Sequence, residues 1–296
     1  MRALVLSGGG AKGSYQLGVY KALKKLGIKI DIITGTSIGS INGALLVAGD
    51  YKKAKKMWLS IKTTEILNYD LEKPSDYTKA AKEIFENKGL KFDKAEGFIT
   101  KVIDEEKVRK SKIDYGLVTV NLKNRVPKML TKERIPKGKL VSYIIASATC
   151  FPAVEKKEID GEYYIDGGYY DNLPINLAVD MGADEVIAVD LAAIGIKQKV
   201  KDKTVKIDYI KNKNKEHFTL NFDPEIARRN IKIGYNDTMK HYKKLEGNIY
   251  TFKKGALDNN YNKISDYYIG LIKRILLSDK KSIAITEILK NRRYKN

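Results

Sequence analysis

Apolar residues follow two different periods along the first 190 residues of the chain. Short apolar runs that predict strands occupy residues 3–7, 29–34, 114–122, 162–166 and 185–191. Apolar residues at helical spacing predict helices at 14–26, 38–48 and 139–149, and Pro174 opens another that runs to about residue 181. Strands that alternate with helices in this way predict a three-layer α/β/α fold with a mainly parallel sheet over residues 1–192.

Two charged stretches lie outside this alternation. Residues 51–110 predict mostly helix, with Trp58 on an apolar stripe that packs in the core or in a lid. Residues 197–215 are rich in lysine and poor in large apolar side chains, which predicts a loop. Beyond that loop, the pattern predicts helices at 224–245 and 263–277.

Positive charge is concentrated in the last hundred residues of this 296-residue chain. The formal net charge is +20, and residues 197–296 hold 25 Lys and Arg against 11 Asp and Glu, a net of +14. A basic surface attracts polyanions, either nucleic acid or anionic lipid headgroups. Plain solvation of a lysine-rich surface is the alternative interpretation.

Cysteine content and hydropathy indicate the compartment. The single cysteine, Cys150, permits no internal disulfide and fits a reducing compartment, where it packs as a small hydrophobe. No stretch approaches the roughly 20 apolar residues needed to cross a bilayer. We therefore expect a soluble cytoplasmic protein that makes at most peripheral contact with a membrane surface.

A glycine cluster separates the first predicted strand from the first helix. Gly8, Gly10 and Gly13 satisfy the G-x-G-x-x-G spacing of dinucleotide sites. Such a site needs an acidic residue at the far end of the second strand, where this chain has Gly35-Thr36-Ser37. A P-loop is also excluded, because Lys12 precedes Gly13. Bare backbone N–H groups at a helix N-terminus remain, and these bind an anion, including a developing oxyanion.

The second predicted strand leads into a candidate nucleophile. The sequence Gly35-Thr36-Ser37-Ile38-Gly39 is a G-x-S-x-G motif between a strand and a helix, the context of a nucleophile elbow. The turn holds the serine in a strained conformation, and the flanking glycines remove side chains that would collide with it. The alternative is a glycine-rich turn in which Ser37 only caps the helix.

A third motif supplies a candidate base. Asp166-Gly167-Gly168 ends the strand at 162–166, so Asp166 points to the edge of the sheet where α/β enzymes bind ligands. A plain Asp-Gly turn is the alternative. The two histidines, His217 and His241, lie in the basic C-terminal third, and Ser37 follows the second strand, early for a Ser-His-Asp hydrolase. Asp166 is therefore favoured over either histidine as the base for Ser37.

Together the three motifs resemble the patatin-like phospholipases in type, order and context. The resemblance extends to residues 146–152, 171–174 and 226–235 and covers about 1–247. It implies a patatin-like catalytic domain over 1–247. Residues 248–296 lie outside the resemblance, and their own pattern predicts a basic helical extension. One departure concerns the acyl groove, because Ala153-Val154 follows Phe151-Pro152 where many members have bulkier residues or proline.

By this resemblance the chain is a carboxylic ester hydrolase of the phospholipase A or lysophospholipase type. Ser37 would be the nucleophile and Asp166 its base, with no histidine, metal or cofactor required. Gly8, Gly9 and Gly10 would form the oxyanion hole, and Lys12 would steady that loop or an anionic headgroup. The supporting glycines would be Gly35, Gly39, Gly167 and Gly168.

The expected partner is a phospholipid or lysophospholipid, with peripheral contact to anionic membrane and without nucleic acid. Two hypotheses from other classes stay open. One is a nucleotide-binding protein that uses the loop from Gly8 to Gly13, and the other is a basic binding module without hydrolysis.

Overall fold

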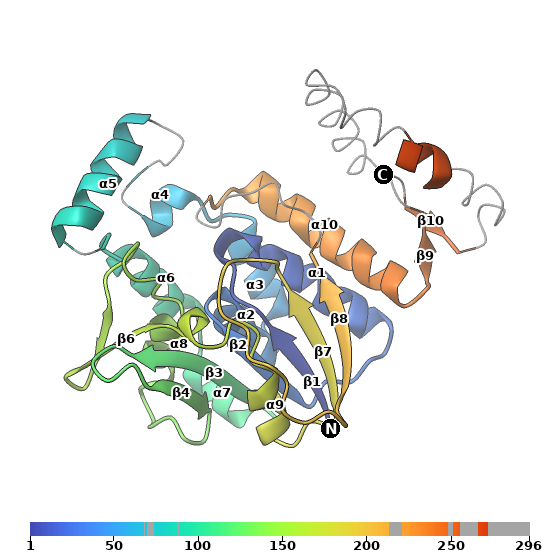
Figure 1. Cartoon of the computed structure of the whole chain (residues 1–296), viewed down its shortest axis with the longest axis horizontal. Coiled ribbons are helices and arrows are strands. Elements are labelled where there is room, and N and C mark those ends of the chain that lie inside the picture. Colours follow the sequence, from blue (N-terminus) through green and yellow to red (C-terminus); the bar gives the residue numbers. More distant parts are fainter. Residues whose placement is uncertain are drawn as a thin grey trace.

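The apolar runs of the sequence come together in one sheet of eight strands (Figure 1). The computed structural model describes residues 1–67, 69, 74–87, 89–212, 221–247, 251–254 and 266–271. The strand order is β5-β6-β3-β2-β1-β7-β8, and β4 pairs with β3. The strands are β1 Arg2–Leu6, β2 Ile32–Thr36, β3 Asp114–Asn121, β4 Pro127–Thr131, β5 Lys157–Ile159, β6 Glu162–Asp166, β7 Glu185–Asp190 and β8 Lys206–Lys211.

The centre of the sheet is parallel and one edge is antiparallel. β1 pairs in parallel with β2 and β7, and the parallel pairing continues to β3 and β8. The pairs β3–β4, β3–β6 and β5–β6 are antiparallel. The predicted α/β fold with a mainly parallel sheet is confirmed. Because β6 runs against β3, its last residue, Asp166, lies beside Thr119, close to the C-terminal end of β3.

Helices cover both faces of the sheet, but unequally. The α-helices are α1 Ser14–Lys25, α2 Ile38–Val47, α3 Tyr51–Trp58, α4 Thr63–Ile66, α5 Pro74–Asn87, α6 Asp93–Val102, α7 Glu105–Lys110, α8 Leu140–Ser147, α9 Ile175–Asp180 and α10 Pro224–His241, and two short 3-10 turns are η1 Gly10–Gly13 and η2 Gly167–Tyr169. Alternate residues of β1 face opposite layers. Leu4 and Leu6 belong to the large core with residues of α1, α2 and α10, whereas Ala3 and Val5 pack with residues of α9.

Several predicted boundaries are wrong for reasons of pairing. The stretch 197–215, expected to be a loop, contains β8, whose backbone pairs with β7 along the edge of the sheet. Its alternation is weak because an edge strand packs few side chains, and Ile210 is its one buried residue. The second strand begins at Ile32, where pairing with Ala3 begins, and not at 29. The strands β4 and β5 were not predicted.

The C-terminal part is described only in pieces. Helix α10 ends at His241, four residues before the predicted end, and Lys243 has a left-handed φ of 54° that does not continue a helix. Leu245–Glu246 (β9) and Phe252–Lys253 (β10) form a small antiparallel pair. Of the helix predicted at 263–277, residues 266–271 are described and helical, and the rest lies outside the described residues. Among the described helices, none has the length and apolar character needed to span a bilayer.

Candidate active site

Ser37 stands on a strained turn between β2 and α2. Its backbone has φ 56° and ψ −128°, a left-handed conformation that few residues other than glycine adopt. Its N–H donates to Ser147 Oγ at 3.0 Å, and that hydroxyl donates in turn to the carbonyl of Val118 at 2.7 Å. The serine therefore precedes the first turn of α2 in the geometry that a nucleophile elbow requires.

The glycines on either side of Ser37 allow the close packing of this turn. A Cβ on Gly39 would lie 2.2 Å from the carbonyl oxygen of Leu6, and one on Gly35 would lie 2.3 Å from the carbonyl oxygen of Gly39. Neither contact is with a flexible side chain, so the backbone itself would have to move. The G-x-S-x-G spacing thus corresponds to two positions where only glycine fits.

Asp166 reaches Ser37 through the register of the sheet. β3 lies between β2 and β6, and it pairs Val118 with Thr36 and the next residue, Thr119, with Asp166. The residue after Thr36 is Ser37, so two residues far apart in the sequence meet across one strand. Gly168 N–H donates to Asp166 Oδ1 at 2.7 Å, and the Ser37 side chain is a further hydrogen-bond partner of the carboxylate.

The carboxyl of Asp166 is buried and its pKa is raised. Burial raises the pKa to about 6, and the hydrogen bonds from the Gly168 amide and the Ser37 side chain oppose that rise. A carboxylate with this pKa is ionised at neutral pH and is a stronger base than an exposed aspartate. It lies within reach of a hydroxyl in the arrangement that nucleophilic catalysis uses.

The predicted glycine loop adjoins the serine, but its three amides differ. Gly8 N–H donates to the carbonyl of Asn172 at 3.1 Å, so this amide is occupied within the protein. Gly9 and Gly10 both line the cavity beside Ser37 and have left-handed φ values of 156° and 51°. Within the described part of the chain, their N–H groups make no backbone hydrogen bond. Of the three predicted donors, the amides of Gly9 and Gly10 therefore remain available to a ligand in the cavity.

Asn172 ties the glycine loop to the rest of the site, a role that sequence reasoning missed. Besides accepting from Gly8, it donates its N–H to the carbonyl of Ile196 at 2.5 Å. Its carboxamide is so close to the glycine loop that a Cβ on Gly8 would lie 2.2 Å from Oδ1. Among the described residues, its buried Nδ2 has no hydrogen-bond partner. The sequence signal that could have indicated this role is the segment Asp171-Asn172-Leu173-Pro174, which is part of the family resemblance.

Of the other residues singled out in the sequence, Lys12 and His241 do not line the cavity. Lys12 is half-exposed and is not among the described residues that line the cavity. His241, at the end of α10, pairs with Asp208 of β8. His217 lies outside the described residues. Cys150 is exposed at the cavity wall and is not packed in the core as predicted. Partial removal of its thiol from water raises the pKa to about 11, so it is a weak nucleophile at neutral pH.

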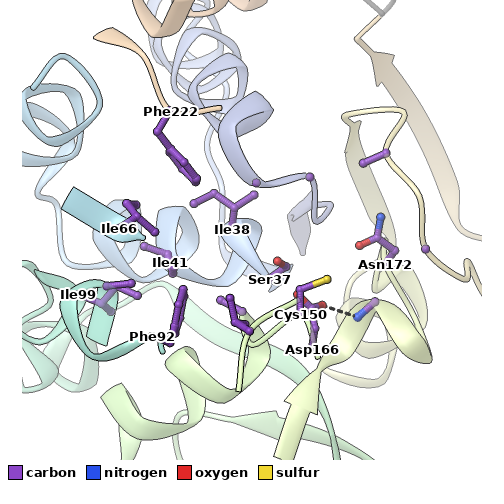
Figure 2. Close-up of a pocket in the computed structure, with 18 of the residues that line it drawn as sticks. Ser37, Ile38, Ile41, Ile66, Phe92, Ile99, Cys150, Asp166, Asn172 and Phe222 are labelled. Atoms are coloured by element: carbon purple, nitrogen blue, oxygen red, sulfur yellow. Dashed lines mark hydrogen bonds between the residues drawn. The ribbon is translucent and has the colours of Figure 1, made fainter. Parts of the chain in front are cut away.

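An elongated cavity of about 750 Å³ extends from the serine into the protein. Figure 2 shows Ser37, Asp166 and Asn172 at one end and Ile66, Phe92 and Ile99 at the other. Trp58 forms part of the wall, stacks on Phe222 and donates from Nε1 to Asn42 at 2.9 Å, so its packing role is as predicted. The volume suits a ligand of moderate size, and the apolar lining suits a hydrocarbon chain.

Comparisons with known proteins identify a family. The family model described as patatin-like phospholipase matches residues 4–179. Patatin-like phospholipase domain-containing protein 6 of Mus musculus is 34% identical over 200 residues, which are 64% of this chain and 13% of that protein. Lysophospholipase nte1 of Aspergillus terreus is 34% identical over 197 residues, 64% of this chain and 12% of the relative. The chain therefore corresponds to a small part of these curated relatives.

Two solved structures are also similar. VipD from Legionella pneumophila has a TM-score of 0.46 and 16% identity, over 81% of this chain and 66% of that one. The type III effector protein ExoU has a TM-score of 0.45 and 13% identity, over 81% of this chain and 52% of that one.

Proposed function

This chain belongs to the patatin-like phospholipase family, and from that premise we propose that it is a serine lipid acyl hydrolase. Its substrates would be phospholipids or lysophospholipids, whose fatty-acyl esters it cleaves through Ser37 and Asp166. The observation that carries the proposal is a strained serine beside a buried aspartate with a raised pKa, at one end of an apolar cavity.

In the acylation step, Asp166 accepts the proton of Ser37 as Oγ attacks the ester carbonyl carbon. The negative charge then moves to the carbonyl oxygen, where the amides of Gly9 and Gly10 donate to it. Each such donor contributes roughly 10²–10³ in rate. The C–O bond breaks as protonated Asp166 returns the proton to the leaving oxygen, and the acyl group remains on Ser37.

In the deacylation step, a water molecule takes the place of the leaving alcohol. Asp166 accepts its proton, the resulting hydroxide attacks the acyl carbon, and Ser37 regains its proton as the fatty acid leaves. An ester suits this dyad better than an amide does. A protonated carboxyl with a pKa of about 6 is acidic enough to protonate an alkoxide, and an alkoxide needs less assistance than an amine anion.

The walls of the cavity support a lipid acyl chain as the bound group. At the end away from Ser37, the side chains come from α2, α4 and α6 and are apolar, so a hydrocarbon tail would replace water there. The net charge of +20 supports peripheral contact with anionic membranes, because basic surfaces concentrate near negatively charged headgroups.

The direct test is to incubate the purified chain with mixed phospholipids and lysophospholipids and to identify released fatty acids by mass spectrometry. We expect release by the wild-type chain and none by Ser37→Ala. The control is His241→Ala, which keeps its activity within a few-fold because His241 pairs with Asp208 and not with Ser37. A wild-type chain that binds these lipids but releases no fatty acid would leave a lipid-binding role without hydrolysis.

A further inference from the structure

Three large apolar side chains stand in solvent at the mouth of the cavity. Tyr169 is 45% exposed, Ile196 is 53% exposed and Ile194 is 103% exposed, which means that the protein covers none of the Ile194 side chain. All three line the cavity that contains Ser37. Single exposed apolar residues are common, but a cluster around the entrance to a binding site marks an interaction surface.

The loop that carries two of them is firmly anchored at its base. We call residues 192–197 the rim loop. The buried carboxylate of Asp190 accepts from Ala192 N–H at 2.8 Å at one end of the loop and from Lys197 Nζ at 2.7 Å at the other. The two anchors hold the ends together, so the residues between them project outwards.

The rim loop is also attached to the residues around the active site. Ile196 N–H donates to the carbonyl of Gly168 at 2.9 Å, and Ile196 accepts from Asn172 N–H. Gly168 is the residue whose amide binds Asp166. The position of Ile194 is thus set relative to Ser37, and a surface that meets the tip of the loop also meets the entrance to the cavity.

We propose that the rim loop is the element by which this protein docks on an anionic phospholipid surface. Ile194 enters the boundary between headgroups and acyl chains, and Ile196 and Tyr169 follow at the mouth. This rests on the proposed function, since it assigns the surface from which that same site draws its lipid. The docked loop shelters the path of an acyl chain from the bilayer to Ser37.

Apolarity and charge together identify the partner as a lipid surface. The rim is continuous with an apolar cavity, so a chain that leaves a bilayer passes from hydrocarbon to apolar protein. The net charge is +20, and the exposed residues Lys199 and Lys201 follow the rim loop directly in the chain. Anionic headgroups complement that charge, whereas a neutral surface offers only the apolar contribution.

Vesicle binding tests the proposal separately from hydrolysis when every chain carries Ser37→Ala. The vesicles contain equal parts of phosphatidylglycerol and phosphatidylcholine, and binding is measured by co-sedimentation. Ile194→Glu should weaken binding by about tenfold or more, because an apolar contact is lost and a negative charge faces an anionic surface. The matched control is Val126→Glu, at a 43% exposed apolar residue that does not line the cavity, and it should bind within twofold of its parent.

Chains that retain Ser37 give a second, catalytic measurement. The quantity is the ratio of hydrolysis on these vesicles to hydrolysis of a soluble short-chain ester. Ile194→Glu should lower this ratio about tenfold, and Val126→Glu should leave it unchanged. If no chain hydrolyses either substrate, the proposed function fails, yet the co-sedimentation result still decides the role of the rim loop.

A fluorescence measurement locates the contact directly. In vesicles with brominated acyl chains, the emission of Ile194→Trp should be quenched, whereas Val126→Trp should show only the background of the native Trp58. Folding of each variant is checked by its thermal melting. The proposal is overturned if folded Ile194→Glu binds vesicles like its parent, or if Ile194→Trp is not quenched.

Discussion

The two ends of the cavity are built in different ways. At the serine end, backbone groups lie close to Ser37 and Asp166: the Leu6 carbonyl leaves no room for a side chain at Gly39, and the Gly168 amide donates to Asp166. At the far end, apolar side chains from α2, α4 and α6 form the wall. Backbone atoms cannot make room for a new group, whereas side chains change rotamer. Under the proposed function, the comparison indicates that the residues at the serine end tolerate little change, whereas those that would select the acyl chain tolerate much.

The largest effect should follow from replacing either member of the proposed dyad, Ser37 or Asp166. Ser37→Ala and Asp166→Asn should each lower kcat/KM for a soluble ester by about 10⁴-fold, since the two act as one unit. The double variant should be little worse than either single one. His241→Ala is the control, and circular dichroism should show all four chains folded. Strongly additive losses would mean that the two residues act independently.

A smaller loss of activity is expected from a substitution in the glycine loop, which also lies at the serine end of the cavity. Gly9→Ala should lower kcat by about 10²–10³ with little change in KM, because the amides act mainly on the transition state. A Cβ there would lie 2.9 Å from Leu191 and would strain a φ of 156°. The matched control is Gly161→Ala, also at positive φ (78°) but with open space around it, which should keep its activity. Equal losses in both variants would attribute the effect to backbone strain alone.

The pH dependence of kcat/KM should report the ionisation of Asp166 at the serine end of the cavity. Because the pKa of Asp166 is raised to about 6, kcat/KM should rise with pH and reach half its maximum near pH 6. Burial also raises the pKa of Asp171 to about 6, but its carboxylate accepts from the amides of Leu173 and Gln198, and Asp171 does not line the cavity. Asp171→Asn should therefore keep the same profile. A half-maximum near pH 4 in the wild-type chain would contradict the effect of burial.

The raised pKa of Asp166 should also affect stability: activity rises with pH, whereas the free energy of unfolding falls. Between pH 4 and pH 6 the native chain binds more protons at Asp166 than the unfolded chain does, so the free energy of unfolding falls as pH rises through this range. Asp166→Asn removes the buried charge. Thermal melting should show a higher Tm than the wild type at pH 7 and an equal one at pH 4.

The smallest effect should come from the far end of the cavity. Ile99→Phe on α6 fills space there, so hydrolysis of a long-chain ester should fall a few-fold while that of a short-chain ester is unchanged. Thr100→Phe adds the same ring at the next position, which is exposed, and should change neither rate. If Ile99→Phe lowered both rates equally, the far end would not be the place where the acyl chain lies.

Local pattern was sufficient to predict the fold class and the motifs around Ser37 and Asp166, but not the part played by Asn172. The helix at Ile38 and the strand ending at Asp166 were predicted from apolar spacing, and the glycines around Ser37 from their chemistry. These features are local, because a turn or a helix start depends on a few consecutive residues. The edge strand β8 was missed for the same reason, since its stability depends on pairing with β7 and little on its own side chains.

The sequence by itself determined which residues are capable of the chemistry, and the tertiary structure decided which of them are available. Gly8 matches the motif as well as Gly9 does, yet its amide is taken by Asn172, more than 160 residues away in the chain. Asp166 is an ordinary aspartate in sequence, and only burial raises its pKa. Hydrogen-bond partners, burial and the cavity all depend on contacts between segments that are distant in the chain. No window of neighbouring residues contains that information, because the register of β3 between β2 and β6 creates it.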